Sequence, residues 1–326
     1  MKKVFITGGA GYVGCELVRE LLSNNFRVFV YDLFIYGEEC LPKDPHLTMI
    51  YGDIRDRGKL ENSLIDIDIC IHLACISNDP SFELNPKLGK EINLDSFEPL
   101  VQSCIKNKVK KFIYASSSSV YGISSSKNVS ENHELKPLTD YSKYKAECEL
   151  ILEKYKNHDL EWTILRPATV CGFSHRQRFD LVVNILTNLA FNNKKIIVFG
   201  GNQMRPNIHI KDMIQAYMLV INSKASQTNF QIFNAGNNNM PVLKIAEAVR
   251  DQFDIDILIE VLETNDNRSY HVSSEKIKKT LKFCPNYEVS NAIKDILNAF
   301  KEKKFKNSLN NEMYFNIKRM QSIQLK

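Results

Sequence analysis

Several classes of protein are excluded by what this sequence lacks. None of its apolar runs approaches the roughly 18 residues that a membrane-spanning helix needs. The first apolar residues, Val4-Phe5-Ile6, lead directly into glycines, whereas a secretory signal peptide needs a longer apolar core and a small-residue cleavage site. We therefore expect a cytoplasmic protein with no membrane partner.

The sequence also carries little excess charge of one sign. Its formal net charge is +5, and the basic residues are scattered apart from residues 301–306 and a few near the C-terminus. A nucleic-acid-binding protein normally concentrates basic residues on one element. No nucleic-acid partner is expected, and the 301–306 stretch is interpreted as a solvated helix end.

Cysteine pairs of the kind that bind metals are absent. None of the eight cysteines belongs to a Cys-x-x-Cys pair, and most occur singly in or beside expected strands and helices. Such cysteines favour buried free thiols over a metal site. We therefore expect no metal ligands.

The first half of the chain alternates short apolar strands with helices. Strands are expected at residues 3–7, 27–31, 47–51, 67–73, 111–116 and 162–166, and helices at 12–23, 94–106 and 141–155. Near-continuous apolar strands separated by helices indicate a parallel sheet covered on both faces. Right-handed crossovers make it doubly wound, so the predicted class is an α/β Rossmann fold.

Beyond Pro167 the alternation is less regular, which indicates a smaller C-terminal α/β lobe. We expect residues 1–170, with 205–235 returning to them, to form the Rossmann domain. Residues 171–204 and 236–326 are expected to form a substrate-binding lobe that closes over the carboxyl edge of the sheet.

A glycine-rich run lies between the first strand and the first helix: Thr7-Gly8-Gly9-Ala10-Gly11-Tyr12-Val13-Gly14. Glycines there allow a tight turn and a close approach of the backbone to a pyrophosphate. The helix N-terminus adds free N–H groups. This placement predicts a dinucleotide site made by Gly8, Gly11, Tyr12, Val13 and Gly14.

Asp32 ends the second strand, where a carboxylate can accept hydrogen bonds from both adenosine ribose hydroxyls. The same carboxylate would repel a 2′-phosphate. No Arg or Lys follows within several residues to bind that phosphate. The expected cofactor is NAD rather than NADP, and the alternative is that Asp32 is a simple turn residue.

Tyr141 and Lys145 are four residues apart at the start of a helix, so they share one helical face. An ammonium beside a phenol would lower the pKa of Tyr141 and suit it to proton transfer. Alone, such a pair is usually a surface pair. Upstream, however, a serine run ends the fifth strand, at the sheet edge where ligands bind: Ala115-Ser116-Ser117-Ser118-Ser119-Val120-Tyr121-Gly122.

Taken in order, these segments resemble the extended short-chain dehydrogenase/reductases, and among them the nucleotide-sugar epimerase/dehydratase group. The resemblance also includes Gly52-Asp53-Ile54, His72-Leu73-Ala74 and Arg166-Pro167, and it covers residues 1–285. It implies an NAD-dependent enzyme that acts on a nucleotide-diphosphate sugar.

The resemblance implies a role for each matching residue. Ser117 would hydrogen-bond the sugar hydroxyl, Tyr141 would take its proton, and Lys145 would bind the nicotinamide ribose. Ser116 and Ser118 remain open as substitutes for Ser117. The residues implied for the cofactor are Asp53 and Ile54 around adenine, with Leu73, Ala74, Asn93 and Ser116 along the rest of the molecule.

The resemblance also implies a substrate site. Arg205, within residues 203–212, and Arg268 correspond to arginines that contact a diphosphate, which suits a guanidinium fork. A surface ion pair is the alternative for each. Residues 176–180, with Arg178, would border the substrate pocket beside Ser117 and Ser118, whereas His175 is expected to be structural or exposed.

One departure narrows the chemistry. The 4,6-dehydratases of this group carry an Asp-Glu pair directly after the catalytic hydroxyl residue, whereas this chain has Ser118-Ser119. Serine has no carboxyl group for acid–base work at neutral pH, so dehydration is disfavoured. The expected reaction is oxidation at carbon 4 through a 4-keto intermediate, by a 4-epimerase or a 4-dehydrogenase.

Two other interpretations remain. A ketosugar reductase would use the same residues, and a catalytically silent NAD-binding regulator would share the fold but is disfavoured because all three catalytic positions are filled. By analogy with the group, we expect a homodimer through residues 94–106 and 141–155 and a role in making surface polysaccharide.

Overall fold

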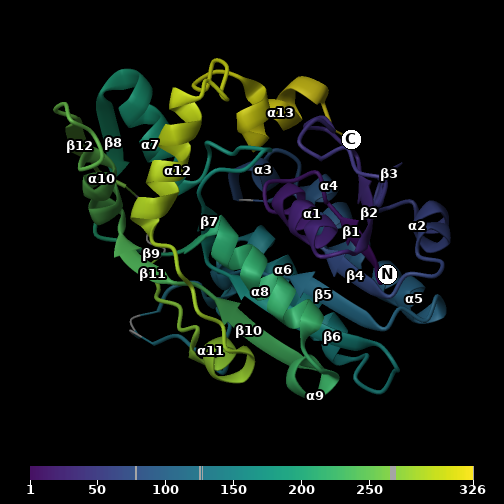
Figure 1. Ribbon diagram of the computed structural model, residues 1–326. Coiled ribbons are helices and arrows are strands. Elements are labelled where there is room, and N and C mark those ends of the chain that lie inside the picture. Colours follow the sequence, from purple (N-terminus) through teal and green to yellow (C-terminus); the bar gives the residue numbers. More distant parts are fainter. Residues whose placement is uncertain (78, 125, 127, 265–268, 326) are drawn as a thin grey trace.

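The computed structural model describes residues 1–77, 79–124, 126, 128–264 and 269–325. Its main sheet has seven strands in the order β10-β6-β5-β4-β1-β2-β3 (Figure 1). Each neighbouring pair is parallel, which confirms the predicted doubly wound fold. The strands are β1 (Lys3–Thr7), β2 (Arg27–Asp32), β3 (Leu47–Tyr51), β4 (Ile69–His72), β5 (Lys111–Ala115), β6 (Glu161–Pro167) and β10 (Gln231–Ala235).

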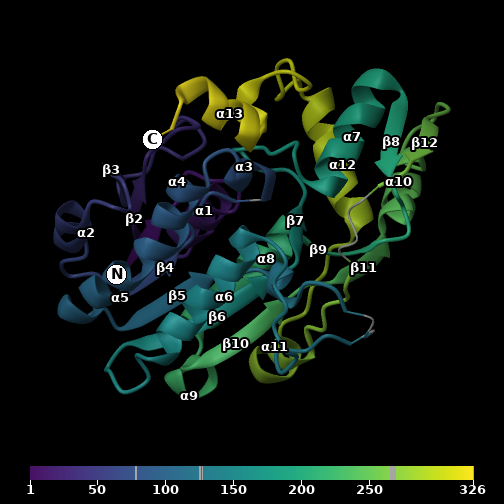
Figure 2. The same cartoon turned by 180° about the vertical axis from the view of Figure 1, so that it is seen from behind.

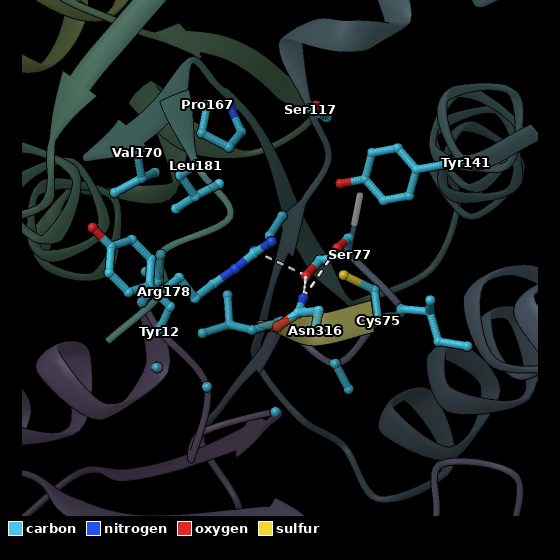
Figure 3. A pocket seen from close by; sticks show the side chains of 18 of the residues that line it. Tyr12, Cys75, Ser77, Ser117, Tyr141, Pro167, Val170, Arg178, Leu181 and Asn316 are labelled. Carbon is cyan, nitrogen blue, oxygen red and sulfur yellow. Dashed lines mark hydrogen bonds between the residues drawn. The ribbon is translucent and has the colours of Figure 1, made fainter. Parts of the chain in front are cut away.

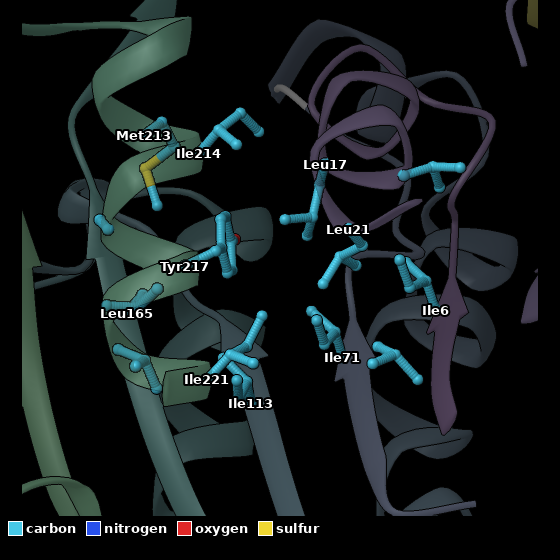
Figure 4. Packing of buried hydrophobic residues seen from close by; sticks show 14 of the residues in the cluster. Ile6, Leu17, Leu21, Ile71, Ile113, Leu165, Met213, Ile214, Tyr217 and Ile221 are labelled. Atoms are coloured by element: carbon cyan, nitrogen blue, oxygen red, sulfur yellow. The ribbon is translucent and has the colours of Figure 1, made fainter. Parts of the chain in front are cut away.

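One face of the sheet is covered by α1 (Gly14–Ser23) and α8 (Ile210–Asn222). In Figure 4, Leu17 and Leu21 of α1 lie opposite Tyr217 and its neighbours on α8, above apolar side chains of the central strands. Ile6 and Ile71 are paired in register and both belong to this cluster. Burying each such side chain contributes about 1.5–3 kcal/mol, so the strands are fixed with this face inward.

The opposite face is covered by α2 (Arg57–Ser63), α5 (Phe97–Lys106) and α6 (Asp140–Glu153). The strands alternate, so Phe5 and Cys70 point to this second cluster while their neighbours point to the first. A π-helical turn (Glu91–Asp95) precedes α5. Short helices complete this part of the chain: α3 (Asp79–Glu83), α4 (Pro86–Lys90), the 3-10 turn η2 (Ser118–Tyr121) and α9 (Ala225–Thr228).

In the part of the chain predicted to form the lobe, a separate apolar cluster lies between three helices and a two-stranded sheet (Figures 1 and 2). Its elements are α7 (Val182–Asn193), β8 (Lys195–Phe199), α10 (Val242–Arg250), β12 (Leu258–Leu262) and α12 (Val289–Lys301). A three-stranded sheet joins the lobe to the Rossmann domain, formed by β7 (Thr169–Cys171), β9 (Met204–His209) and β11 (Asn238–Pro241).

Two C-terminal segments return from the lobe to the Rossmann domain. Helix α11 (Glu275–Leu281) places Ile277 and Leu281 in the same cluster as β10, although the sequence placed all of residues 236–326 in the lobe. After the turn η3 (Glu312–Tyr314), α13 (Asn316–Ile323) crosses to the side of α3, as both views show (Figures 1 and 2). Met320 of α13 is buried in the second cluster. The division into two domains stays a prediction.

No helix in the described part of the chain is long and apolar enough to cross a bilayer. Among the same residues, no group of three or more His, Cys, Asp or Glu side chains could hold a metal ion. The cytoplasmic location and the homodimer stay predictions.

His72 gives the fold a pH dependence that can be measured. Its ring is buried, lies 2.7 Å from the Thr7 hydroxyl through Nδ1, and stacks on Tyr114. Burial, with a smaller contribution from the Lys145 ammonium, lowers the pKa of His72 to about 3. Below its ordinary value of 6.5 the unfolded chain therefore binds a proton that the folded protein does not, and stability falls.

We predict that the free energy of unfolding is about 2 kcal/mol lower at pH 5 than at pH 7 through His72 alone. Urea unfolding of the wild type and of His72→Gln at both pH values isolates this contribution, because glutamine does not titrate. An equal pH dependence in the two proteins would show that His72 is protonated in the folded state.

Candidate active site

A cavity of about 500 Å³ opens at the carboxyl edge of the main sheet, between the Rossmann domain and the lobe. The loops after β1, β2, β4 and β5 supply one wall, and the segments after β6 and β7 supply the other. Figure 3 shows Tyr141 and Ser117 facing this space from one end, with Arg178 extending across it. The cavity brings together most of the residues that the sequence singled out.

The glycine turn can hold a dinucleotide because its backbone is closely packed. Gly8 has φ +74°, and an added Cβ would lie 2.6 Å from the Ala74 nitrogen. An added Cβ at Gly14 would lie 2.5 Å from the Gly8 oxygen. Bare backbone therefore faces the cavity at the N-terminus of α1, where a diphosphate is favoured by free N–H groups and the helix dipole. The predicted residues Gly8, Gly11, Tyr12, Val13 and Gly14 all line the cavity.

Asp32 lies at the cavity edge, with both carboxylate oxygens held by the backbone. Oδ2 accepts from the Ala10 N–H at 2.9 Å, and Oδ1 accepts from the Phe34 N–H at 2.8 Å. Burial raises the pKa of Asp32, and these backbone N–H groups oppose that shift. Each oxygen keeps further acceptor capacity for a ribose hydroxyl.

Four other predicted cofactor residues line the cavity: Asp53, Ile54, Leu73 and Ala74. The Asp53 carboxylate pairs with Arg55 at 2.7 Å, which lowers its pKa against the effect of burial. Asn93 differs from expectation because it does not line the cavity. Its amide is buried and makes two hydrogen bonds to the backbone of Ile76, at 2.8 and 3.0 Å, so it braces the loop after β4.

Ser117, Tyr141 and Lys145 all line the cavity. Helix α6 begins at Asp140 with a capping box of Thr139 and Ser142, which places Tyr141 in its first turn. Ser117 and Tyr141 face the same space (Figure 3), and the Ser117 oxygen accepts from the Ser119 N–H and hydroxyl. The Lys145 ammonium donates to the Ala115 carbonyl at 2.7 Å and lies 5.9 Å from the centre of the Tyr141 ring.

The pKa of Tyr141 differs from the sequence-based expectation. Burial raises it well above 10, and Cys75 and Asp79 raise it further, whereas Arg178 and Ser117 lower it. Lys145 was expected to lower this pKa, but its ammonium is held by the Ala115 carbonyl beneath the ring. The raised pKa favours the neutral phenol form of Tyr141.

A buried ion pair fixes the helix that carries Tyr141. Arg166 of β6 donates to Glu149 of α6 at 3.0 Å through Nε, and both side chains are almost fully buried. Glu149 also accepts from Ser116 at 2.5 Å. The Ser116 hydroxyl is thus engaged behind the cavity, although Ser116 lines it. Removing one partner of such a pair costs about 3–5 kcal/mol, so α6 is held firmly against β5 and β6.

Most of the residues that were expected to bind substrate line the cavity. Ser118 lines the cavity from the loop after β5 and Arg205 from β9, and the Ser118 hydroxyl lies 3.4 Å from that of Tyr270. Arg178 lines it from the segment after β7, paired with Asp180 at 2.8 Å. Arg268 lies outside the described residues. His175 is half-exposed and contacts Glu16 at 2.8 Å, away from the cavity lining.

The structure adds residues that the sequence did not single out. They are Tyr36, Cys75, Ser77, Asp79, Arg176, Asp180, Asn316 and Met320. Arg176 and Asp180 lay inside the quoted segment 176–180, so that segment was the available signal. No sequence signal indicated Asn316, because it reaches the cavity from a helix far along the chain.

Comparison with known proteins identifies a family and several proteins that this chain resembles. The model of the NAD dependent epimerase/dehydratase family matches residues 4–236. The UDP-glucose 4-epimerase of Lactobacillus helveticus is 28% identical over 308 residues, which are 88% of this chain and 93% of the relative. A putative UDP-glucose 4-epimerase of Methanocaldococcus jannaschii is 30% identical over 231 residues, 69% of this chain and 75% of the relative.

A solved structure is also similar. The UDP-glucuronic acid 4-epimerase from Bacillus cereus, in complex with UDP-glucuronic acid and NAD, matches with a TM-score of 0.84 and 25% identity. The match covers 92% of this chain and 99% of that protein.

We predict that Gly14→Ala weakens NADH binding at least tenfold and destabilises the protein by about 1–3 kcal/mol, because the new methyl group displaces the turn. Gly58→Ala is the matched control, since its Cβ would meet only Asp56 Oδ1, at 3.8 Å. That variant should bind NADH normally and gain up to about 1 kcal/mol of helix stability. NADH titration and thermal unfolding test both, and unchanged NADH affinity in Gly14→Ala would exclude the glycine turn as the cofactor site.

Proposed function

Because this chain belongs to the NAD-dependent epimerase/dehydratase family, we propose that it inverts carbon 4 of a nucleotide-diphosphate sugar through a 4-keto intermediate. Membership confirms the family and the NAD dependence predicted from the sequence. The observation that carries the proposal is that Ser117, Tyr141 and Lys145 line the same cavity as a glycine turn that fits a dinucleotide. Bound NAD supplies a hydride acceptor, and its reduced form a hydride donor.

In this mechanism Tyr141 takes the proton of the sugar's 4-hydroxyl as carbon 4 is oxidised, and returns it when the ketone is reduced. A phenol with a raised pKa needs help to ionise. Ser117 lines the same cavity and would stabilise the phenolate, or the sugar hydroxyl, by donating a hydrogen bond. Lys145 provides a fixed positive charge under the ring, with its geometry set by the Ala115 carbonyl.

The lobe side of the cavity suits the remainder of a sugar nucleotide. Arg205 can pair with a diphosphate, and Ser118 and Tyr270 present hydroxyls near Ser117 for the sugar ring. The related proteins named above are UDP-sugar 4-epimerases by their descriptions. We therefore propose a UDP-linked sugar as the first substrate to test.

Epimerisation is favoured over net oxidation because α13 crosses the cavity. Asn316 and Met320 line it from this helix, beside Ser77 and Ile54. A cofactor beneath such a segment stays bound between the two hydride transfers, which an epimerase requires. A dehydrogenase would instead have to reoxidise its cofactor after every turnover, by exchanging it or by passing the hydride to a second substrate. Dehydration remains disfavoured because Ser118 and Ser119 offer no carboxyl group beside Ser117.

The reaction can be followed with sugars carrying deuterium at carbon 4. We predict that purified protein converts one of a panel of UDP-, dTDP-, GDP- and CDP-linked sugars into its 4-epimer with the deuterium retained at carbon 4 and no net NADH. NMR and absorbance at the NADH band measure both. Accumulation of a 4-keto sugar with one equivalent of NADH would make the protein a dehydrogenase, and loss of a 6-oxygen would make it a dehydratase.

Tyr141→Phe should lower kcat by about 10²–10⁴, the usual contribution of a positioned acid–base group. NADH affinity should change less than threefold, because the ring remains. Tyr144→Phe is the matched control: Tyr144 lies one turn further along α6 and packs on Phe82 at 5.5 Å. Turnover near the wild-type rate in Tyr141→Phe would assign proton transfer to another residue.

A further inference from the structure

Two guanidinium groups are buried in the wall of the cavity with donors left unpaired. Arg176 is 4% exposed and Arg178 is 8% exposed. Arg176 Nε and Arg178 Nη2 are buried and have no hydrogen-bond partner among the described residues. Leaving such donors unpaired is costly, so they indicate that a ligand completes the site. We infer that Arg176 and Arg178 form a clamp for the diphosphate of the bound dinucleotide, positioned by Asn316.

Arg176 lies at the adenosine end of the cavity. Its guanidinium carbon is 3.5 Å from the centre of the Tyr36 ring, in the loop after β2. It is close enough to Asp32 to oppose the rise in that carboxyl's pKa. No carboxylate of the described residues lies within 4.0 Å of Arg176, and burial lowers its own pKa. A buried cation without a contacting anion favours an anionic ligand.

Arg178 reaches across the cavity from the same segment. Its Nη1 donates to the Ser77 hydroxyl at 3.1 Å, in the loop after β4, and its Nε donates to Asp180 at 2.8 Å. The loop after β4 packs directly on the glycine turn, because an added Cβ at Gly8 would strike Ala74. Figure 3 shows Arg178 extending toward Ser77 and Asn316. Its unpaired Nη2 therefore lies in the wall of the cavity that the glycine turn also lines.

The segment carrying both arginines is fixed to the glycine turn itself. The Tyr12 hydroxyl donates to the Gly172 carbonyl at 2.7 Å, and the Ser174 hydroxyl donates to the Tyr12 carbonyl at 2.7 Å. Both bonds are buried. The arginines therefore keep their place relative to the N-terminus of α1, and arginine suits paired phosphate oxygens.

Asn316 positions the clamp from the C-terminal helix. Its side-chain oxygen accepts from Arg176 at 2.7 Å and from the Tyr36 hydroxyl at 2.9 Å. Its side-chain nitrogen donates to the Ser77 hydroxyl at 2.9 Å, and its backbone N–H donates to Asp180 at 3.1 Å. One residue thus joins the loops after β2 and β4 to the arginine segment. Asn316 lies beyond residue 236, where the family match ends.

The dinucleotide, rather than the substrate, is the diphosphate in reach. Every contact of Arg176, and the Ser77 contact of Arg178, involves loops next to the glycine turn or α13, whereas Tyr270 and Arg205 line the cavity from later segments. Arg178 also extends far enough toward Tyr141 to lower the pKa of that phenol. For Arg178 this replaces the role expected from the sequence. The inference rests on the cofactor part of the proposed function and not on the identity of the sugar.

Binding measurements without turnover test the clamp. Arg176→Met and Arg178→Met should each weaken NADH and ADP-ribose binding roughly ten- to a hundredfold, because each removes charge-assisted bonds to a diphosphate. UDP affinity should change less than threefold. Calorimetry with NADH, ADP-ribose and UDP gives these constants, and adenosine, which lacks phosphate, should bind the variants and the wild type alike.

The control is Arg250→Met, which removes an exposed arginine paired with Asp251 at 3.1 Å on α10. It should leave all four affinities unchanged. Thermal unfolding without ligand checks the fold: Arg176→Met should be at least as stable as the wild type, because it removes a buried cation, yet should gain less stability from saturating NADH. Arg176→Lys should recover only part of the affinity, since an ammonium lacks the planar fork.

Asn316→Ala tests the positioning residue. Its NADH dissociation rate should rise at least tenfold with both arginines intact, while UDP affinity is kept. Wild-type NADH affinity in Arg176→Met would overturn the clamp, whether or not the protein epimerises a sugar. Loss of UDP affinity with normal NADH binding in Arg178→Met would return Arg178 to the substrate. Tighter binding of NADPH than NADH to the wild type would show that Arg176 recognises a 2′-phosphate instead.

Discussion

The packing of the glycine turn against the loop after β4 is the constraint on which the rest of the site depends. Gly8 and Gly14 leave no room for a side chain, because an added Cβ would lie within 2.6 Å of neighbouring backbone atoms. This contact brings bare N–H groups of α1 to the cavity and holds the loop after β4 against the turn. The segment after β7 is bonded to the same turn through Tyr12. Both walls of the cavity are therefore placed relative to one short stretch of backbone.

Two buried arginines, Arg166 and Arg176, illustrate the difference between a structural charge and one that faces the cavity. Arg166 has all its contacts within the protein: Glu149, the Tyr121 hydroxyl at 2.8 Å and a backbone carbonyl. Such a satisfied pair fixes α6 and with it Tyr141. Arg176 is buried to a similar degree but has an unpaired donor and no contacting carboxylate among the described residues. The two arginines differ in whether all their donors are hydrogen-bonded, and not in how deeply they are buried. This difference distinguishes Arg166, which fixes α6, from Arg176, which we propose binds an anion.

The sequence predicted the features that depend on residues close together in the chain, and missed those that depend on contacts between distant residues. Strand periodicity, the glycine turn and the Tyr141–Lys145 spacing depend on neighbours within one or two elements, and these predictions match the described elements. The strands β7, β9 and β11 were not predicted, because they are short, partly polar and exist only through pairing with one another. Asn93 was expected at the cofactor, yet its side chain is used by Ile76, which only the folded loop reveals. The pKa of Tyr141 likewise depends on burial, which the spacing to Lys145 does not report.

The residues proposed for proton transfer and the residue proposed to retain the cofactor lie in different parts of the chain. Every residue assigned to proton transfer lies within residues 4–236, the part shared with the family. Asn316 lies in a C-terminal helix outside that part, and it contacts Tyr36, Ser77 and Arg176 together. If Asn316 positions the proposed clamp, a change in this helix alters how long the dinucleotide stays bound without touching the atoms that react. Under the proposed mechanism, retention of the reduced cofactor favours epimerisation over net oxidation, so a segment that carries none of the proposed catalytic side chains would influence the outcome of the reaction.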